Sequence, residues 1–141
     1  MSVTNRNSMR IAGMLALLSF AAGNALAGDI KVTLTGEYEV PAVTTKATGS
    51  GTITIKDDKT VTGSVTTKEL VGVAAHIHVA PVGKNGPPAI TMTKTADNVW
   101  SVPEGSKLSD EQYAAFKAGD LYVNVHSAAN KGGEIRGQLK P

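Results

Sequence analysis

Short stretches in which apolar and polar residues alternate recur along this chain of 141 residues. The stretch 30–34 alternates strictly, and the stretches 52–55 and 60–66 repeat the pattern on either side of a turn at 56–59. Strict alternation is typical of strands that bury one face, and two such stretches around a short turn predict a hairpin. The chain is therefore expected to fold around the buried face of a sheet.

The remaining sequence predicts more strands and a single helix. Further strands are expected around 73–79, 90–92, 99–102, 121–126 and 134–139. Ser109 and Gln112 have the spacing of a capping box, which predicts a short helix from Asp110 to Ala118, with Gly119 directly after it. About eight short strands and one short helix near Asp110-Ala118 predict an all-β, Greek-key-like β-sandwich.

The N-terminal segment has the three parts of a secretory signal peptide. A basic start precedes an apolar run at 11–22, and Ala-Leu-Ala at 25–27 offers a small-residue cleavage site. The run is too short for a comfortable membrane span. We expect a signal peptide at 1–27, a single domain at 28–141, a periplasmic or secreted location and no membrane span after cleavage.

Charge and cysteine content exclude two classes of function. The chain has 14 basic and 12 acidic residues, and because Arg6 and Arg10 lie in the expected signal peptide, the rest is formally neutral. A neutral surface argues against general attraction to nucleic acid. The absence of cysteine excludes disulfides and thiolate sites, so an exported domain of this size depends on apolar burial, to which a metal could add.

All three histidines of the chain fall in two predicted strands. His76 and His78 are two residues apart in the stretch 73–79, and His126 ends the stretch 121–126. Because alternate residues of a strand point to the same side, His76 and His78 share a face. If His126 meets them, three neutral imidazoles suit one copper or zinc ion, with ring nitrogens about 3–4 Å apart. We predict these three as metal ligands, with copper preferred over zinc, and hydrogen-bonded structural histidines are the alternative.

Four more polar residues are expected to support such a site. Glu39 and Glu134 are carboxylates that could accept the second N–H of a metal-bound imidazole, and Asn124 shares a face with His126 and could hold its ring. The alternative is that Glu39 caps a turn and that Glu134 pairs on the surface with Arg136, which has the same strand parity.

Several segments in a fixed order resemble a known family. They are Leu34-Thr35-Gly36, Glu39-Val40-Pro41, Ala75-His76-Ile77-His78 with Asn85-Gly86-Pro87, and 119–126 leading to 132–137. With these segments the chain resembles the chordin-type domain, CHRD, of bacterial exported proteins and of animal chordin. The resemblance implies the fold and an extracytoplasmic location. Because chordin is a secreted binder of growth factors, it also hints at an interaction module, although no general activity is attached to the family.

A fainter likeness is to copper,zinc superoxide dismutase. The H-x-H of His76 and His78, with His126 closing a V-x-V-H strand, is similar to the copper ligands of that enzyme, and Arg136 after two glycines stands loosely where its active-site arginine does. The chain has no bridging histidine, no further zinc-ligand histidines and no cysteine pair. The likeness therefore implies a version with a single metal.

The sequence predicts an exported CHRD-type protein that binds a single copper ion, for storage or delivery, with no catalysis assumed. One alternative is a metal-free extracytoplasmic module that contacts another envelope protein. The other is a dismutase-like redox enzyme, which is disfavoured because a neutral chain gives no evident electrostatic funnel.

Overall fold

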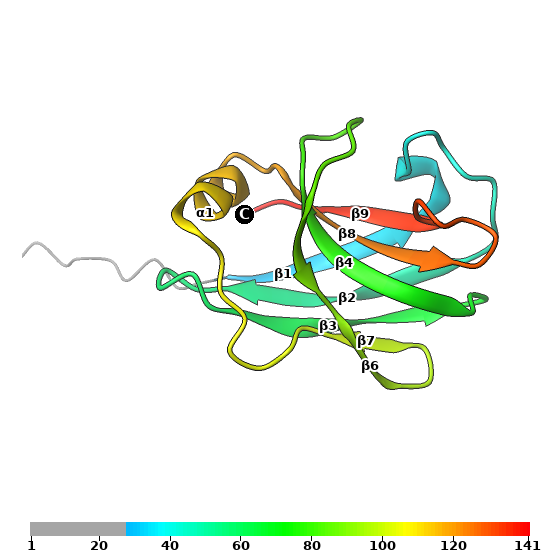
Figure 1. Cartoon of the computed structure of the whole chain (residues 1–141), viewed down its shortest axis with the longest axis horizontal. Coiled ribbons are helices and arrows are strands. Elements are labelled where there is room, and N and C mark those ends of the chain that lie inside the picture. Colours follow the sequence, from blue (N-terminus) through cyan, green and yellow to red (C-terminus); the bar gives the residue numbers. More distant parts are fainter. Residues whose placement is uncertain (1–27) are drawn as a thin grey trace, which may run out of the picture.

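The computed structural model describes residues 28–141, and the expected signal peptide at 1–27 lies outside the described residues. Nine strands and one α-helix make up the described chain (Figure 1). The strands are β1 (Asp29–Thr35), β2 (Thr48–Ile55), β3 (Val61–Lys68), β4 (Gly72–Val79), β5 (Pro88–Thr91), β6 (Thr93–Ala96), β7 (Val99–Ser101), β8 (Leu121–Ser127) and β9 (Ile135–Leu139). The helices are α1 (Asp110–Lys117) and a short 3-10 turn, η1 (Gly36–Tyr38).

The strands form one antiparallel sheet whose two edges meet. Their order is β5-β4-β8-β9-β1-β2-β3-β7-β6. The edge strands β5 and β6 are separated only by Met92, whose backbone N–H donates to the carbonyl of Ala75 in β4 at 2.9 Å. The sheet therefore curves into a nearly closed sandwich, which confirms the all-β prediction. The single strand expected at 90–92 is instead two strands, one on each edge, because the chain crosses between the edges at Met92.

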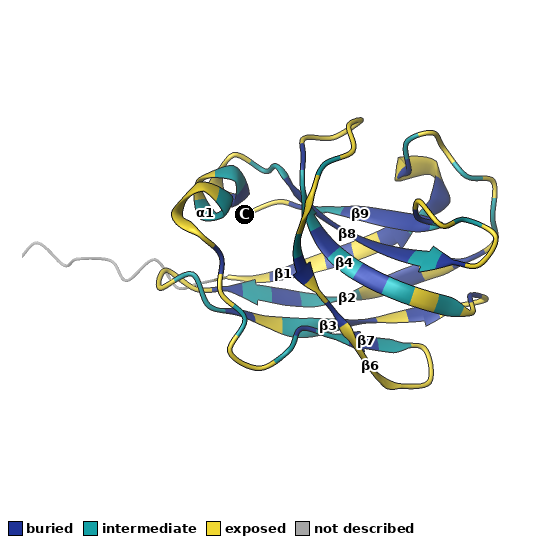
Figure 2. Ribbon diagram, viewed as in Figure 1, coloured by how far each residue is buried: buried dark blue, intermediate teal, exposed yellow. Residues whose placement is uncertain are grey.

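The core lies between the facing layers of this curved sheet. Leu34, Ile53, Ile77 and Val123 are completely buried on the inward side of β1, β2, β4 and β8. Figure 2 shows the alternation that the sequence predicts, with buried and exposed bands along β1 and buried and half-buried bands along β4. Because the inward side holds the apolar residues, the histidines of β4, the polar residues at 122, 124 and 126 of β8, and those at 136 and 138 of β9 point to the outer face.

The structure contains the hairpin and the helix that the sequence predicts. Strands β2 and β3 pair along their whole length. At the start of α1, the backbone N–H of Gln112 donates to Ser109 Oγ at 3.1 Å, and the backbone N–H of Ser109 donates to Gln112 Oε1 at 2.9 Å. Gly119 follows the helix with φ of 82°. Within residues 28–141, no helix has the length and apolar character needed to cross a membrane.

Candidate metal centre

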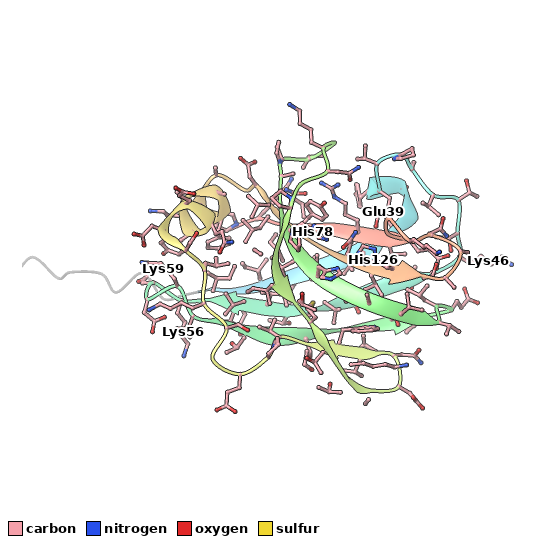
Figure 3. All side chains as sticks on the ribbon, in the orientation of Figure 1. Glu39, Lys46, Lys56, Lys59, His78 and His126 are labelled. Carbon is pink, nitrogen blue, oxygen red and sulfur yellow. The ribbon has the colours of Figure 1, made fainter. Side chains whose placement is uncertain are left out.

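The three histidines lie on the outer face of two paired strands. In the β4–β8 pair, His76 lies opposite Asn124, and Ala74 lies opposite His126. His76 and His126 are therefore diagonal neighbours, a distance that long side chains span. His78 shares the face of His76 because it is two residues further along β4. Figure 3 shows His78 and His126 in the same part of the molecule, over β4 and β8.

The rings converge as the sequence predicts. Nδ1 of His76 lies 3.0 Å from Nε2 of His126, and one nitrogen of each histidine lies within 4.8 Å of the others. The ring centroids are 4.9 Å apart for His76 and His126, and 5.3 Å for His76 and His78. Ligands of one tetrahedral or trigonal ion with bonds of about 2.0–2.1 Å lie about 3.3–3.6 Å apart, so the most distant pair of nitrogens must approach by up to about 1.5 Å for all three to bind one ion.

Backbone carbonyls fix the tautomers of two rings. Nδ1 of His78 lies 2.8 Å from the carbonyl oxygen of Gly86, and Nδ1 of His126 lies 2.8 Å from that of Lys131. A carbonyl oxygen only accepts, so both Nδ1 atoms carry the proton and both Nε2 atoms carry a lone pair. His126 Nε2 therefore accepts from Nδ1–H of His76. To become a ligand through Nδ1, His76 must move this proton to its own Nε2.

One of these lone pairs is buried without a partner. Nε2 of His78 makes no hydrogen bond of good geometry within residues 28–141, although Asn124 lies near enough to raise the pKa of the ring. An unsatisfied buried polar atom costs about 1–3 kcal/mol, and a metal ion is a partner that satisfies an imidazole lone pair. The donor set thus fits one metal ion held by Nδ1 of His76 and Nε2 of His78 and His126.

The environment keeps two of the rings neutral. Burial lowers the pKa of His76, and the neighbouring His126 and His78 lower it further. Burial also lowers the pKa of His78, although its hydrogen bond to the Gly86 carbonyl opposes this shift. Neutral imidazole is the form that binds metals, so the cluster carries ligands ready for a cation at neutral pH.

The carboxylates expected to support the rings have other partners. Glu134 accepts from the side-chain amide of Asn130 at 2.9 Å, and Glu39 accepts from that of Asn124 at 3.5 Å. The ring nitrogens instead donate to the backbone of Gly86 and Lys131. Residue type carries no signal for a carbonyl acceptor, which is why the sequence did not show these partners.

Gly86 is the one residue whose type indicates the loop that holds the His78 ring. A Cβ at this position would lie 1.8 Å from the carbonyl oxygen of Val79, so only glycine lets the loop fold back onto β4. The same loop is held against β9, where Gln138 donates to the carbonyl of Ala80 at 2.9 Å.

Glu39 is the C-cap residue of η1, where its backbone N–H donates to the carbonyl of Gly36 at 3.1 Å, and its side chain is a buried acid beside the cluster. Only 5% of Glu39 and 1% of Asn124 are exposed. Burial raises the pKa of Glu39 to about 7, although the positive charge of Arg136 and the hydrogen bond from Asn124 oppose the shift. Gly133, with φ of 130°, makes room for both side chains, because a Cβ there would lie 2.3 Å from Glu39 Oε1. Figure 3 shows Glu39 close to His126 in projection.

Arg136 is buried, so the expected surface pair with Glu134 is wrong. Only 1% of Arg136 is exposed, and the sole ion pair within residues 28–141 is between two other residues. The guanidinium carbon lies 3.4 Å from the centroid of the Tyr122 ring, and the His78 ring stacks on Tyr122 at 4.9 Å with an angle of 5°. Because β8 lies between β4 and β9, Tyr122 is placed between His78 and Arg136.

One comparison with known proteins gives a match. A family model described as the CHRD domain matches residues 30–139. No curated protein and no solved structure matches the chain. The family match covers almost all of the described residues, including both histidine strands. The chain therefore belongs to the CHRD domain family.

Proposed function

We propose that this CHRD domain protein binds a single copper ion through His76, His78 and His126. The observation that supports the proposal best is the convergence of three ring nitrogens within 4.8 Å, one of which, Nε2 of His78, is buried without a partner. The proposed role is metal storage or delivery, with no catalysis assumed.

Copper is preferred over zinc on the chemistry of the ligands. The donors are three imidazole nitrogens, and the affinity of such a site for divalent ions is higher for copper than for zinc. Three protein ligands leave a coordination position open, which a water molecule or an acceptor protein could take during delivery. The dismutase-like alternative gains no support from Arg136, since its side chain is buried against Tyr122.

We also propose that the protein works outside the cytoplasm, where another envelope protein could receive the metal. The support is the sequence of residues 1–27, with its basic start, apolar run and small-residue cleavage site. Cell fractionation and the N-terminal sequence of the purified protein test this. A mature protein that begins at Gly28 outside the cytoplasm is the expected result, and an uncleaved cytoplasmic protein would contradict it.

Calorimetric titration with Cu²⁺ and Zn²⁺ tests metal binding. The expected result is one copper ion per chain, with tighter binding of copper than of zinc. His78→Ala removes a ligand and should weaken copper binding by more than about 100-fold, above the 10–100-fold typical of residues that only support a ligand. Lys131→Ala is the matched control, because it keeps the backbone carbonyl that orients His126 and should leave the affinity unchanged.

Two outcomes would reject the proposal. One is the absence of bound or titratable copper at micromolar protein, which would favour the metal-free interaction module. The other is copper binding that survives His78→Ala unchanged. Consumption of superoxide by the copper-loaded protein would instead support the redox alternative.

A further inference from the structure

A cavity of about 260 Å³ opens on the outer face of β1 and β9, and no histidine lines it. Arg136, Gln138 and Lys140 are alternate residues along and just beyond β9, so they point to the same side and line the cavity together with Thr33 of β1. Tyr38, at the end of η1, and Val82, in the loop after β4, also line it. The cavity thus combines the polar row of β9 with two loops.

The charged residues that line this cavity are all positive. Two cations, Arg136 and Lys140, line it, and no acidic residue does. Arg136 donates only to neutral oxygens, to Asn85 Oδ1 at 3.4 Å and to the carbonyl of Pro81 at 3.3 Å. No carboxylate of residues 28–141 lies within 4.0 Å of its nitrogens. Buried guanidinium groups are normally paired with an anion, so this pocket presents an unmatched positive charge.

Glu39 does not supply the missing anion. Its charge acts on Arg136, but the two groups form no ion pair. Burial also raises the pKa of Glu39 to about 7, so a large fraction of this carboxyl is protonated at neutral pH. The guanidinium therefore keeps most of its positive charge, and because only 1% of Arg136 is exposed, a ligand in the cavity reaches this charge only if the side chain turns toward it.

Two apolar side chains stand exposed around this charge. Tyr38 is 53% and Val82 is 63% exposed, and both line the cavity. A cavity with two cationic side chains and two exposed apolar side chains suits an anion that also carries an apolar group. The planar fork of arginine matches a carboxylate, and the volume lies just below the 300–1,000 Å³ typical of drug-sized ligands, so the ligand is small.

We propose that this cavity binds a small organic monocarboxylate. The carboxylate lies on Arg136 and Lys140, and the apolar body lies between Tyr38 and Val82. The site is separate from the histidine cluster, so the proposal does not depend on metal binding.

Benzoate is a suitable probe of this site. Titration into the metal-free protein, followed by amide chemical shifts, should give a dissociation constant of about 1 mM, as expected of a ligand this small. The shifts should centre on Val82, Gly83 and Gln138. Benzamide, which has the same shape without the charge, and acetate, which has the charge without the ring, should each bind at least about 10-fold more weakly.

Variants assign the binding to particular side chains. Lys140→Gln and Tyr38→Ser are substitutions of accessible residues, and each should weaken benzoate binding about 3–10-fold. Arg136→Lys keeps the charge but loses the planar fork, and should weaken binding by more than about 10-fold. Lys94→Gln, on the exposed edge strand β6, makes the same charge change as Lys140→Gln away from the cavity and should have no effect.

The proposal is overturned by any of four results. The first is that no amide shift changes at about 50 mM benzoate, and the second is that the changes lie away from the cavity. The third is that benzamide or inorganic phosphate binds as tightly as benzoate. The fourth is that the affinity for benzoate is unchanged in both Lys140→Gln and Tyr38→Ser. If thermal unfolding shows that Arg136→Lys does not fold, the affinities of Lys140→Gln and Tyr38→Ser still test the proposal.

Discussion

The buried carboxyl of Glu39 makes the stability of this fold depend on pH. Its pKa is about 7 in the folded protein, against an ordinary value of 4.5 for a glutamate in water. Below pH 4.5 the carboxyl is protonated in both states, so it has no ionisation cost. Between pH 4.5 and 7 the unfolded chain releases the proton and the folded chain retains it, so stability falls as pH rises and levels off above pH 7. At 1.36 kcal/mol per pH unit, this loss amounts to about 3 kcal/mol.

Glu39→Gln isolates this effect because glutamine has nearly the same shape and cannot ionise. The amide oxygen can still accept from Asn124. We expect the variant to be about 3 kcal/mol more stable than the wild type at pH 8 and equal to it near pH 4. Urea unfolding of the metal-free protein at several pH values between 4 and 8 measures the difference. Glu104→Gln, at an exposed position, is the control and should change stability by less than about 0.5 kcal/mol at every pH.

The difference between Glu39→Gln and wild type must change with pH for this reasoning to hold. A constant difference from pH 4 to 8 would refute it, because the carboxyl would then ionise alike in the folded and unfolded chains. A variant that is less stable than the wild type at pH 8 would also refute it, since ionised Glu39 would then stabilise the fold through Arg136 more than its burial costs.

Two glycines offer further tests of the same region. Gly133→Ala should lower the free energy of unfolding by about 2–4 kcal/mol, because its Cβ would overlap Glu39 and its φ of 130° is unfavourable for alanine. Gly132→Ala, with no atom within 4 Å of the new Cβ, should be nearly neutral in the same urea titration. Gly86→Ala should displace the carbonyl that orients His78 and weaken copper binding about 10–100-fold by calorimetry, whereas unchanged affinity would show that this carbonyl is dispensable.

Features encoded by neighbouring residues were predictable from the sequence. The alternation of Ile30, Val32 and Leu34 predicted β1, and the capping box at Ser109 predicted the start of α1. Both features depend only on residues that are close in the sequence. The break at Met92 was not predictable. Ile90 and Met92 are both buried and fit one alternating strand, and only the pairing of β5 with β4 and of β6 with β7 separates them.

The same limit applies to the candidate site. Strand parity and the family resemblance brought His76, His78 and His126 together correctly, because parity fixes which face each residue occupies. The burial of Glu39 and Arg136 depends instead on two loops, 36–47 and 80–87, that lie over the outer face. The pattern along a single strand carries no information about what covers its polar side, so the sequence did not predict the burial of either residue.

The polar residues beneath these loops are costly for a domain this small. Glu39, Asn124 and Arg136 are all buried, and both Asn124 Oδ1 and His78 Nε2 lack partners within residues 28–141. Apolar residues of similar volume are often as stabilising as a buried charged set, or more so, and departures from local rules of stability concentrate at functional sites. A metal ion would satisfy His78, and a carboxylate would satisfy Arg136. Because Tyr122 lies between these two side chains, a ligand that moves Arg136 changes the packing against His78. The two proposed sites are therefore expected to influence each other through this one ring.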